Sequence, residues 1–380
     1  MLFCGETSFG RTAPMKKWCG PSCLWKWCLR FLMLSSYTSC SRLATAFSVK
    51  DGQIYTADNQ PYHLRGMSWF GFETPDFMLN GLWLHPISWY LDLLKAEGIT
   101  TLRIPFSAEL VLYHPNQYPD ERFVSAEPEA QHKMCAEVLD LLFEKCQERN
   151  MTVMLDLHRL HKEFISELWY SPTDSAFTAD DFVRVWETML QRYGRHPNLI
   201  AIDLLNEPHG QATWGAGNPS TDWNHFAEGV IPILGNYVPS ASYLLFVEGI
   251  EWGHTFRDYP RKPLSVPDEF QHRVVFSPHT YGRSVVPESS FDANILYSQW
   301  DSDFDFLRTQ HSKTVVVGEW GGRTAIDQPW MQILVQYLQD RNMTDNFFWS
   351  LGPNSDDVQG FLLDDWTSVD TFKRGILKQM

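Results

Sequence analysis

Apolar residues along the chain gather into short runs of strand length, and most runs are almost continuously apolar rather than alternating. A continuous apolar run is typical of a strand covered on both faces, because a half-exposed strand alternates apolar and polar positions. The pattern therefore predicts buried, parallel strands. They are expected at 63–69, 100–106, 151–158, 199–206, 242–249, 273–281, 314–320 and 346–351.

Between these runs, apolar positions recur three and four residues apart, which is the spacing of one face of an α-helix. Thr178 is expected to cap the N-terminus of the predicted helix at about 182–189, and Gly194 is expected to end that helix. The clearest helical patterns lie at about 87–94, 135–146, 182–189 and 330–338.

Repeated alternation of strand and helix predicts an α/β fold, a single (β/α)8 TIM barrel that spans residues 47–380 as one domain. Just before the first run, Asp51 and Gly52 sit between two short apolar segments and predict a short N-terminal β-hairpin, because they tolerate the positive φ angles of a tight turn. An open doubly wound sheet is the alternative, but no glycine-rich phosphate loop follows any run.

The first 46 residues have a different character and read as a signal or leader segment. Basic residues precede a short apolar stretch at 31–34, and Ala44-Thr45-Ala46 offers small residues for cleavage. A disordered extension and a later start at Met15 are the alternatives. Five of the seven cysteines fall in this segment, at Cys4, Cys19, Cys23, Cys28 and Cys40. We expect a secreted, extracellular protein.

Charge and composition narrow the class of partner. With 31 Lys and Arg against 46 Asp and Glu, the formal net charge is −15, which argues against a nucleic acid. No apolar stretch reaches the roughly 20 residues of a membrane span. Cys135 and Cys146 share one predicted helix too far apart to form a disulfide bond. The 16 Trp residues suit stacking against sugar rings.

The ends of the runs carry the chemistry, because the active site of such a barrel lies at the carboxyl ends of its strands. Glu207 ends the apolar run Ile202–Leu205 and Glu319 ends Val315–Val317. Two carboxylates are the minimum requirement for cleaving a glycosidic bond. The other run ends are also polar or aromatic, with Arg103, His158, Asn206, His279, Tyr281 and Trp349 at or near them.

Each of these residues taken alone has an ordinary structural explanation. Glu207 could simply end a strand before Pro208, and Glu319 could be a turn residue. His158 and His161, with Glu163 nearby, suggest a metal, but their spacing is wrong for two ligands on one strand face. We therefore expect no metal. The joint occurrence of polar residues at so many run ends favours a catalytic site.

The motifs at the run ends also form one ordered set. It comprises Ser68-Trp69-Phe70-Gly71-Phe72-Glu73-Thr74, Arg103, His158-Arg159, Asn206-Glu207-Pro208-His209, Phe246-Val247-Glu248-Gly249, His279-Thr280-Tyr281, Gly318-Glu319 and Phe348-Trp349-Ser350. With this set, the chain from about Ser48 to its C-terminus resembles glycoside hydrolase family 5, the cellulase family. More narrowly, it resembles the bacterial-type endo-β-1,4-glucanase subfamily.

The resemblance implies a retaining mechanism without metal or organic cofactor. Glu207 would be the general acid/base and Glu319 the nucleophile, while Asn206 would hydrogen-bond the sugar 2-OH. A retaining enzyme needs its two carboxyl groups about 5–5.5 Å apart, against about 6.5–9.5 Å in an inverting one. We expect the shorter separation.

The other motif residues would support this pair. Arg103 would keep Glu319 ionised, since a nearby cation lowers the pKa of a carboxyl group. Tyr281 would donate a hydrogen bond to the nucleophile, His279 would lie near it, and His158 would bind substrate hydroxyls.

Four tryptophans are candidates for sugar stacking. Trp349 would form the floor of the subsite on the non-reducing side of the cleaved bond, and Trp69 would be a further platform. Trp252 and Trp169 are candidates for the reducing-end side. The chain departs from the family at Thr280, where relatives often carry Asp, and at Leu351-Gly352, where they often carry another Trp.

The sequence thus predicts a secreted, monomeric, retaining endo-β-1,4-glucanase that acts on β-glucan. Another β-glycosidase of the family is the nearer alternative, such as a mannanase, a β-1,3-glucanase or a glycolipid hydrolase. A glycan-binding protein without turnover is the alternative from a different class, since a fold does not dictate an activity.

Overall fold

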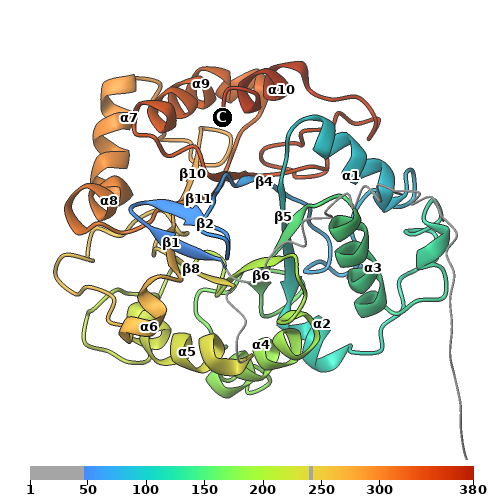
Figure 1. Cartoon of the computed structure of the whole chain (residues 1–380), viewed down its shortest axis with the longest axis horizontal. Coiled ribbons are helices and arrows are strands. Elements are labelled where there is room, and N and C mark those ends of the chain that lie inside the picture. The colour runs from blue at the N-terminus through green and yellow to red at the C-terminus, as the bar shows by residue number, and fades with distance from the viewer. Residues whose placement is uncertain (1–46, 239–242) are drawn as a thin grey trace, which may run out of the picture. The chain divides into compact units, whose positions relative to one another are not determined.

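The computed structural model describes residues 47–238 and 243–380 (Figure 1). The predicted leader, with its five cysteines, lies outside the described residues. Cys135 and Cys146 are both free and buried in one helix, in agreement with the prediction that they form no disulfide bond with each other. Among the described residues, no helix is both long and apolar enough to cross a membrane.

Parallel strands form one sheet in the order β10-β11-β12-β4-β5-β6-β7-β8-β9. β9 and β10 are two parts of one strand, interrupted at Pro278, and Phe276 bridges to Val315 just before β11, so the sheet closes into a barrel. Each predicted run contains a strand, and the predicted TIM barrel is confirmed. The strands are β4 (Arg65–Ser68), β5 (Thr101–Ser107), β6 (Thr152–Arg159), β7 (Leu199–Asp203), β8 (Leu244–Glu248), β9 (Val274–Ser277), β10 (His279–Tyr281), β11 (Val317–Gly321) and β12 (Asn346–Phe348).

Helices surround the barrel (Figure 1). The four helices expected from the sequence are α1, α3, α4 and α9. Thr178 caps α4 as predicted, because its side chain accepts from the backbone N–H of Asp181 while the Asp181 carboxylate accepts from the N–H of Thr178. The helices are α1 (Ile87–Ala96), α2 (Ala108–Tyr113), α3 (Cys135–Glu148), α4 (Ala179–Tyr193), α5 (Trp223–Tyr237), α6 (Asp268–Gln271), α7 (Ala293–Trp300), α8 (Phe306–His311), α9 (Thr324–Asp340) and α10 (Thr371–Leu377), with a 3-10 turn at Pro128–Ala130 and a π-helical turn at Asp301–Asp305.

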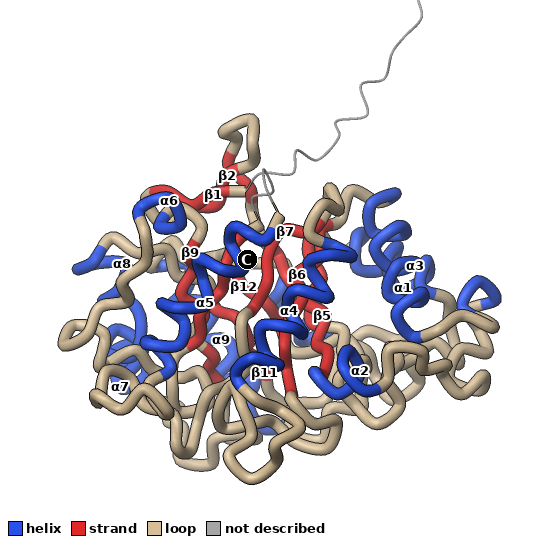
Figure 2. The backbone as a smooth tube through the Cα atoms, turned by 90° about the horizontal axis from the view of Figure 1, so that it is seen from below, coloured by secondary structure: helices blue, strands red, loops and turns tan. Residues whose placement is uncertain are grey.

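The N-terminal hairpin covers one end of the barrel. β1 (Ser48–Lys50) and β2 (Gln53–Tyr55) pair as predicted, and β3 (Pro61–Tyr62) adds a third strand. The Tyr62 hydroxyl lies 2.9 Å from the Thr152 hydroxyl, at the start of β6. Figure 2 shows β1 and β2 at this end and long loops at the opposite end. The open end is therefore the one formed by the carboxyl ends of the strands.

The interior of the barrel has two chemically different layers. Near the hairpin it is filled by a buried apolar cluster that includes Met154, Phe246 and Phe347. Gly66 on β4 makes room for this cluster, because a Cβ atom there would lie 2.1 Å from the Phe347 ring. Toward the carboxyl ends, the interior holds fully buried charged side chains instead. The apolar layer supports a polar one, and the polar layer forms the floor of the site.

Candidate active site

A cleft of about 590 Å³ lies at the carboxyl ends of the barrel strands. It is formed by loops that follow several different strands, so residues distant in the sequence meet there. Its lining includes Phe70, Glu73, His158, Glu207, Trp252, Tyr281, Glu319 and Trp349.

Glu207 and Glu319 meet at the bottom of this cleft. Glu207 follows β7, Glu319 lies within β11, and both are almost fully buried. A carboxylate oxygen of each lies within 4.8 Å of the other, with the imidazole of His279 close to both. His279 Nδ1 is 3.1 Å from Glu207 Oε1 and 3.8 Å from Glu319 Oε2. The barrel thus brings the two strand-end carboxylates together, as the sequence predicted.

The surroundings of Glu319 stabilise its charged form. The Arg103 guanidinium donates to Glu319 Oε1, and the Tyr281 hydroxyl donates to Oε2 at 2.5 Å. Burial alone would raise the pKa of Glu319, but the charges of Arg103 and His279 outweigh it and hold the pKa below its ordinary value. Glu319 is therefore an ionised carboxylate with one oxygen facing each donor.

Arg103 does more than the sequence suggested. Arg103 lies in the middle of β5, so the expectation that it lies near the end of the strand is wrong. Its long side chain reaches the site from within the barrel. Its Nη2 atom lies 3.1 Å from Asp156 and Asp203 and 3.4 Å from Glu248. One buried cation therefore binds several carboxylates besides Glu319.

Glu207 has the opposite environment. Burial raises its pKa, the hydrogen bond from His279 opposes this, and the charge of Glu319 adds to it, so that the pKa lies above its ordinary value. Its backbone has a φ of 50°, in the left-handed region, and its N–H donates to Glu248 Oε2 at 2.7 Å. The neighbouring Asn206 is fully buried and accepts from Arg103, while its Nδ2 has no partner among the described residues.

His158 and Trp349 form one wall of the cleft. The His158 ring lies 5.2 Å from that of Trp349 at an interplanar angle of 3°, and Phe70 stacks on the same indole at 5.4 Å. His158 Nδ1 is 2.7 Å from Asp156 Oδ2, and burial lowers the pKa of His158 well below its ordinary value. The neutral ring keeps its Nε2 for the cleft.

Trp252 lines the cleft as the sequence suggested, and its side chain is 45% exposed. Its ring stacks on that of His209 with 3.4 Å between centroids, and its backbone N–H donates to Pro208. Trp252 is therefore held against the chain segment that carries Glu207.

Two of the tryptophan predictions are wrong. Trp69 is 1% exposed, packs on Tyr90 of α1 and donates its indole N–H to the Asn80 carbonyl, because it points away from the barrel interior. Trp169 is 2% exposed, stacks on Phe226 of α5 and borders a different groove. Neither offers a face to the cleft.

Three acidic residues in or beneath the cleft are not among the site residues predicted from the sequence. Glu73 lines the cleft, and burial raises its pKa to about 7 against the opposing charge of Arg159. Asp156 lies two residues before His158 on the same face of β6, a spacing that could have identified it. Glu248 ends an apolar run as Glu207 does, and this signal was present in the sequence.

Thr280, which departs from the family pattern, lies on β10 and is buried. Its hydroxyl accepts a hydrogen bond from the indole of Trp300 at 2.9 Å. The substitution therefore anchors a helix that packs behind the barrel strand. Leu351, at the other departure, is fully buried and offers no stacking surface.

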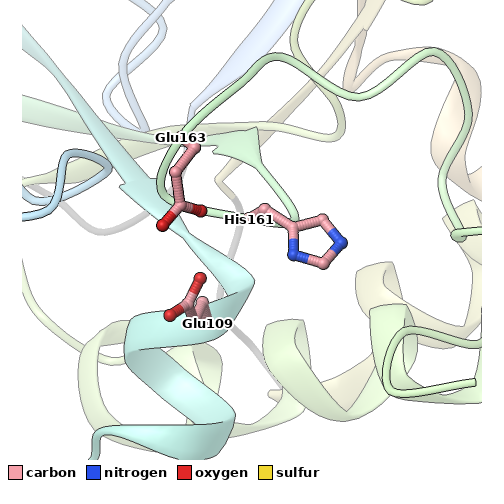
Figure 3. A group of neighbouring side chains, drawn as sticks. All are labelled: Glu109, His161 and Glu163. Atoms are coloured by element: carbon pink, nitrogen blue, oxygen red, sulfur yellow. The ribbon is translucent and has the colours of Figure 1, made fainter. Parts of the chain in front are cut away.

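Outside the cleft, Glu109, His161 and Glu163 bring possible ligand atoms within 4.8 Å of one another (Figure 3). The ammonium of Lys162 lies 2.6 Å from Glu109 and 3.8 Å from Glu163. A cation from the chain itself thus already pairs with these carboxylates. In the cleft, Arg103 has the same role toward its buried acids.

Comparison with known proteins gives a consistent picture. The family model for Cellulase (glycosyl hydrolase family 5) matches residues 55–355. An endoglucanase of Paenibacillus polymyxa is 34% identical, with 90% of each chain covered. The major extracellular endoglucanase of Xanthomonas campestris pv. campestris is 31% identical, with 89% of this chain and 72% of that protein covered.

Solved structures agree with this. A complex of an endocellulase variant from Pyrococcus horikoshii with cellotetraose superposes with a TM-score of 0.81 at 30% identity, covering 88% of this chain and 98% of that one. The catalytic domain of the Xanthomonas campestris enzyme gives a TM-score of 0.80 at 30% identity, covering 87% and 99%.

Proposed function

The chain belongs to glycosyl hydrolase family 5 and is a glycoside hydrolase, and from this premise we propose that it is a secreted endo-β-1,4-glucanase that retains the anomeric configuration. The observation that carries the mechanism is the spacing of Glu207 and Glu319, whose nearest oxygens lie within 4.8 Å. This fits a retaining pair, because an inverting enzyme leaves room for a water molecule and separates its carboxyl groups by about 6.5–9.5 Å.

Glu319 is the nucleophile in this proposal. Its lowered pKa keeps it ionised, and it attacks the anomeric carbon to form a covalent glycosyl-enzyme. Arg103 and Tyr281 hold the two carboxylate oxygens in fixed directions. They orient the charge without protonating it.

Glu207 is the acid and then the base. Its raised pKa favours the protonated form, which can donate to the leaving oxygen. The negative charge of Glu319 is one cause of the raised pKa of Glu207, and this charge is lost once Glu319 is esterified. The pKa of Glu207 then falls, and the carboxylate accepts a proton from the attacking water.

The rest of the cleft binds the sugar chain. Asn206 Nδ2 is placed to donate to the 2-OH, and His158 presents its free nitrogen to neighbouring hydroxyls. Trp349 offers a stacking surface for the non-reducing side, and Trp252 offers one for the reducing-end side. Relatives named as endoglucanases and the cellotetraose complex of a similar structure support a β-1,4-glucan as substrate.

Secretion is part of the proposal. The basic and then apolar leader supports it, as does a relative described as extracellular. N-terminal sequencing of protein recovered from the medium would locate the cleavage point, and a mature protein that keeps residues 1–46 would contradict cleavage of this leader.

A substrate screen tests the substrate class. Hydrolysis of carboxymethyl cellulose, mannan and laminarin should be fastest on the cellulose derivative, with a rapid fall in viscosity because internal bonds are cut. Activity on mannan or laminarin alone would contradict the β-1,4-glucan assignment. Binding of all three without hydrolysis would favour the glycan-binding alternative.

A further inference from the structure

Glu248, at the end of β8, lies directly behind the catalytic pair. It is fully buried, and its two carboxylate oxygens face different partners. Oε2 accepts the backbone N–H of Glu207 at 2.7 Å, while Oε1 lies 3.2 Å from His279 Nε2 and 3.4 Å from Arg103. One side chain thus contacts both the main chain of Glu207 and the imidazole beside its carboxylate.

His279 links the two glutamates. Its Nδ1 is within hydrogen-bonding distance of Glu207 Oε1, and its Nε2 lies 3.2 Å from Glu248 Oε1 as an ion-pair contact without hydrogen-bond geometry, so the ring lies between two carboxylates. Burial alone would lower the pKa of His279, but Glu248, Glu319 and the bond to Glu207 outweigh it and raise the pKa well above its ordinary value. Burial also raises the pKa of Glu248 well above its ordinary value, and the charges of His279 and Arg103 oppose that rise. A cationic imidazole in turn lowers the pKa of Glu207.

The backbone contact holds an unfavourable conformation. A φ of 50° is uncommon for a residue with a side chain and persists only where its surroundings enforce it. The loop after β8 closes over the same carboxylate, because a Cβ atom on Gly253 would lie 2.8 Å from Glu248 Oε2 and 3.1 Å from the His279 ring. The contact is therefore fully buried and tightly enclosed by the chain.

The other titratable groups around Glu248 and His279 come from the neighbouring strands and from the loop after β8, where burial and then the charge of His279 lower the pKa of His254 to about 4. Arg103 extends from β5 and Glu319 from β11. Asp156 on β6 and Asp203 on β7 are also fully buried; burial raises their pKa values to about 7 and about 6, while Arg103 opposes the rise in both. Glu319 also lies near both Glu207 and His279, but none of these side chains accepts the backbone N–H of Glu207 as Glu248 does.

We propose that Glu248 is a positioning residue that holds Glu207 in its acid/base role, with one oxygen fixing the Glu207 backbone and the other holding the His279 ring. The proposal rests on the function proposed above. Glu248 touches neither substrate nor the reacting atoms and acts only through the two residues that it contacts.

Two substitutions separate these contacts. Glu248→Gln keeps an oxygen that can accept from the Glu207 N–H, but it places an NH2 group near His279 Nε2. Only the neutral imidazole can accept a hydrogen bond from that NH2 group, because an imidazolium has no free acceptor nitrogen. The cation beside Glu207 is then lost, the pKa of Glu207 rises, and the basic limb of the kcat/KM profile moves to higher pH. Glu248→Ala removes the backbone acceptor as well.

Glu248→Ala is tested by comparing its kcat/KM on two substrates. Cellopentaose needs acid catalysis to expel its leaving group, whereas 2,4-dinitrophenyl β-cellobioside does not. We expect kcat/KM on cellopentaose to fall about 10- to 100-fold, which is at or below the lower end of the ~100- to 10,000-fold that acid catalysis contributes because Glu207 itself remains, with a much smaller loss on the aryl cellobioside. A merely structural role would lower both together. Glu269→Gln, on the exposed surface of α6, is the matched control and should match the wild type on both substrates.

The outcomes are distinct. The proposal is wrong if the basic limb of the kcat/KM profile of Glu248→Gln stays at the wild-type pH. It is also wrong if Glu248→Ala lowers kcat/KM by the same factor on both substrates. The wild type gives a measurement that does not depend on a variant folding: the 15N shifts of His279, assigned by their loss in His279→Gln, should be those of an imidazolium at neutral pH. A neutral ring would overturn the proposal. Failure of the wild type on both substrates would refute the proposed function instead.

Discussion

Glu207 and Glu319 have identical side chains, so the difference between their pKa values comes from their surroundings alone. Arg103 and Tyr281 lower the pKa of one, while burial and the charge of its partner raise that of the other. Two carboxyl groups with pKa values pushed apart are the arrangement expected of an acid and a nucleophile. At this scale, the roles follow from contacts within a few ångströms.

The pH dependence of kcat/KM follows from these two directions. Activity needs Glu319 ionised, so it falls as the pH drops through the lowered pKa of Glu319. It also needs Glu207 protonated, so it falls as the pH rises through the raised pKa of Glu207. We expect a bell-shaped profile on cellopentaose, measured with initial rates at constant ionic strength.

Glu207→Gln tests which limb belongs to which residue. On 2,4-dinitrophenyl β-cellobioside, whose leaving group needs no proton, the variant should keep much of its kcat/KM and lose the basic limb, while the acid limb remains. A basic limb that persists in Glu207→Gln would mean that another group is the acid.

Arg103 is the residue whose loss should cost the most stability. It is fully buried against Asp156, Asp203, Glu248 and Glu319, and removing it leaves these carboxylates without their cation. We expect Arg103→Met to lose about 3–5 kcal/mol of unfolding free energy, measured by urea denaturation at neutral pH.

The control is Arg122→Met, because Arg122 pairs with Asp120 on the surface and its side chain is 86% exposed. An exposed pair of this kind contributes little. Equal urea midpoints for the two variants would show that the buried carboxylates take up protons at no cost, and Arg103 would then not be what stabilises them.

At the scale of single elements, β4 shows how tightly the barrel is filled. A Cβ atom on Gly66 would collide with the Phe347 ring of β12, which is fully buried and cannot move aside. Gly66→Ala should therefore destabilise the protein by about 1–3 kcal/mol, measured by thermal unfolding. The double variant with Phe347→Leu should recover part of this loss.

Gly229, inside α5, is the matched control, because a Cβ atom there would have no neighbour within 4 Å. Alanine at this position should stabilise the protein by about 0.5–1 kcal/mol, because glycine is unfavourable in a helix interior. A Gly66→Ala variant as stable as Gly229→Ala would contradict the packing described for the barrel floor.

Strands and helices were largely predictable because each obeys a local rule. A parallel strand covered on both faces is continuously apolar, and the runs at 199–206 and 314–320 gave β7 and β11 on that basis. An apolar run in the sequence does not predict which way a large side chain at its end will point. Trp69 follows β4 but faces α1, and Trp169 packs on α5, because an indole fills a core as readily as it binds a sugar.

The site was predictable to the extent that strand ends mark it. Glu207, Glu319, His279 and Tyr281 were placed correctly in the cleft region by this rule alone. The buried network beneath them was not, because it depends on how far the Arg103 side chain reaches and on which carboxylates surround it. Those contacts arise only when the barrel closes.

At the scale of the whole molecule, the barrel is closed at one end and open at the other. The hairpin and the apolar cluster cover the end where the strands begin, and the cleft lies at the opposite end. This arrangement keeps Glu207 and Glu319 in a low-dielectric environment at the bottom of a cleft that is open to solvent.

The most direct test of the retaining mechanism is to trap its covalent intermediate. Incubation with 2,4-dinitrophenyl 2-deoxy-2-fluoro-β-cellobioside, followed by peptide mass spectrometry, should give one fluorocellobiosyl adduct, on the peptide that contains Glu319 and at that side chain. An adduct on a different residue, or an active enzyme that forms none and releases product of inverted configuration, would contradict the assignment of Glu319 and Glu207 as a retaining pair.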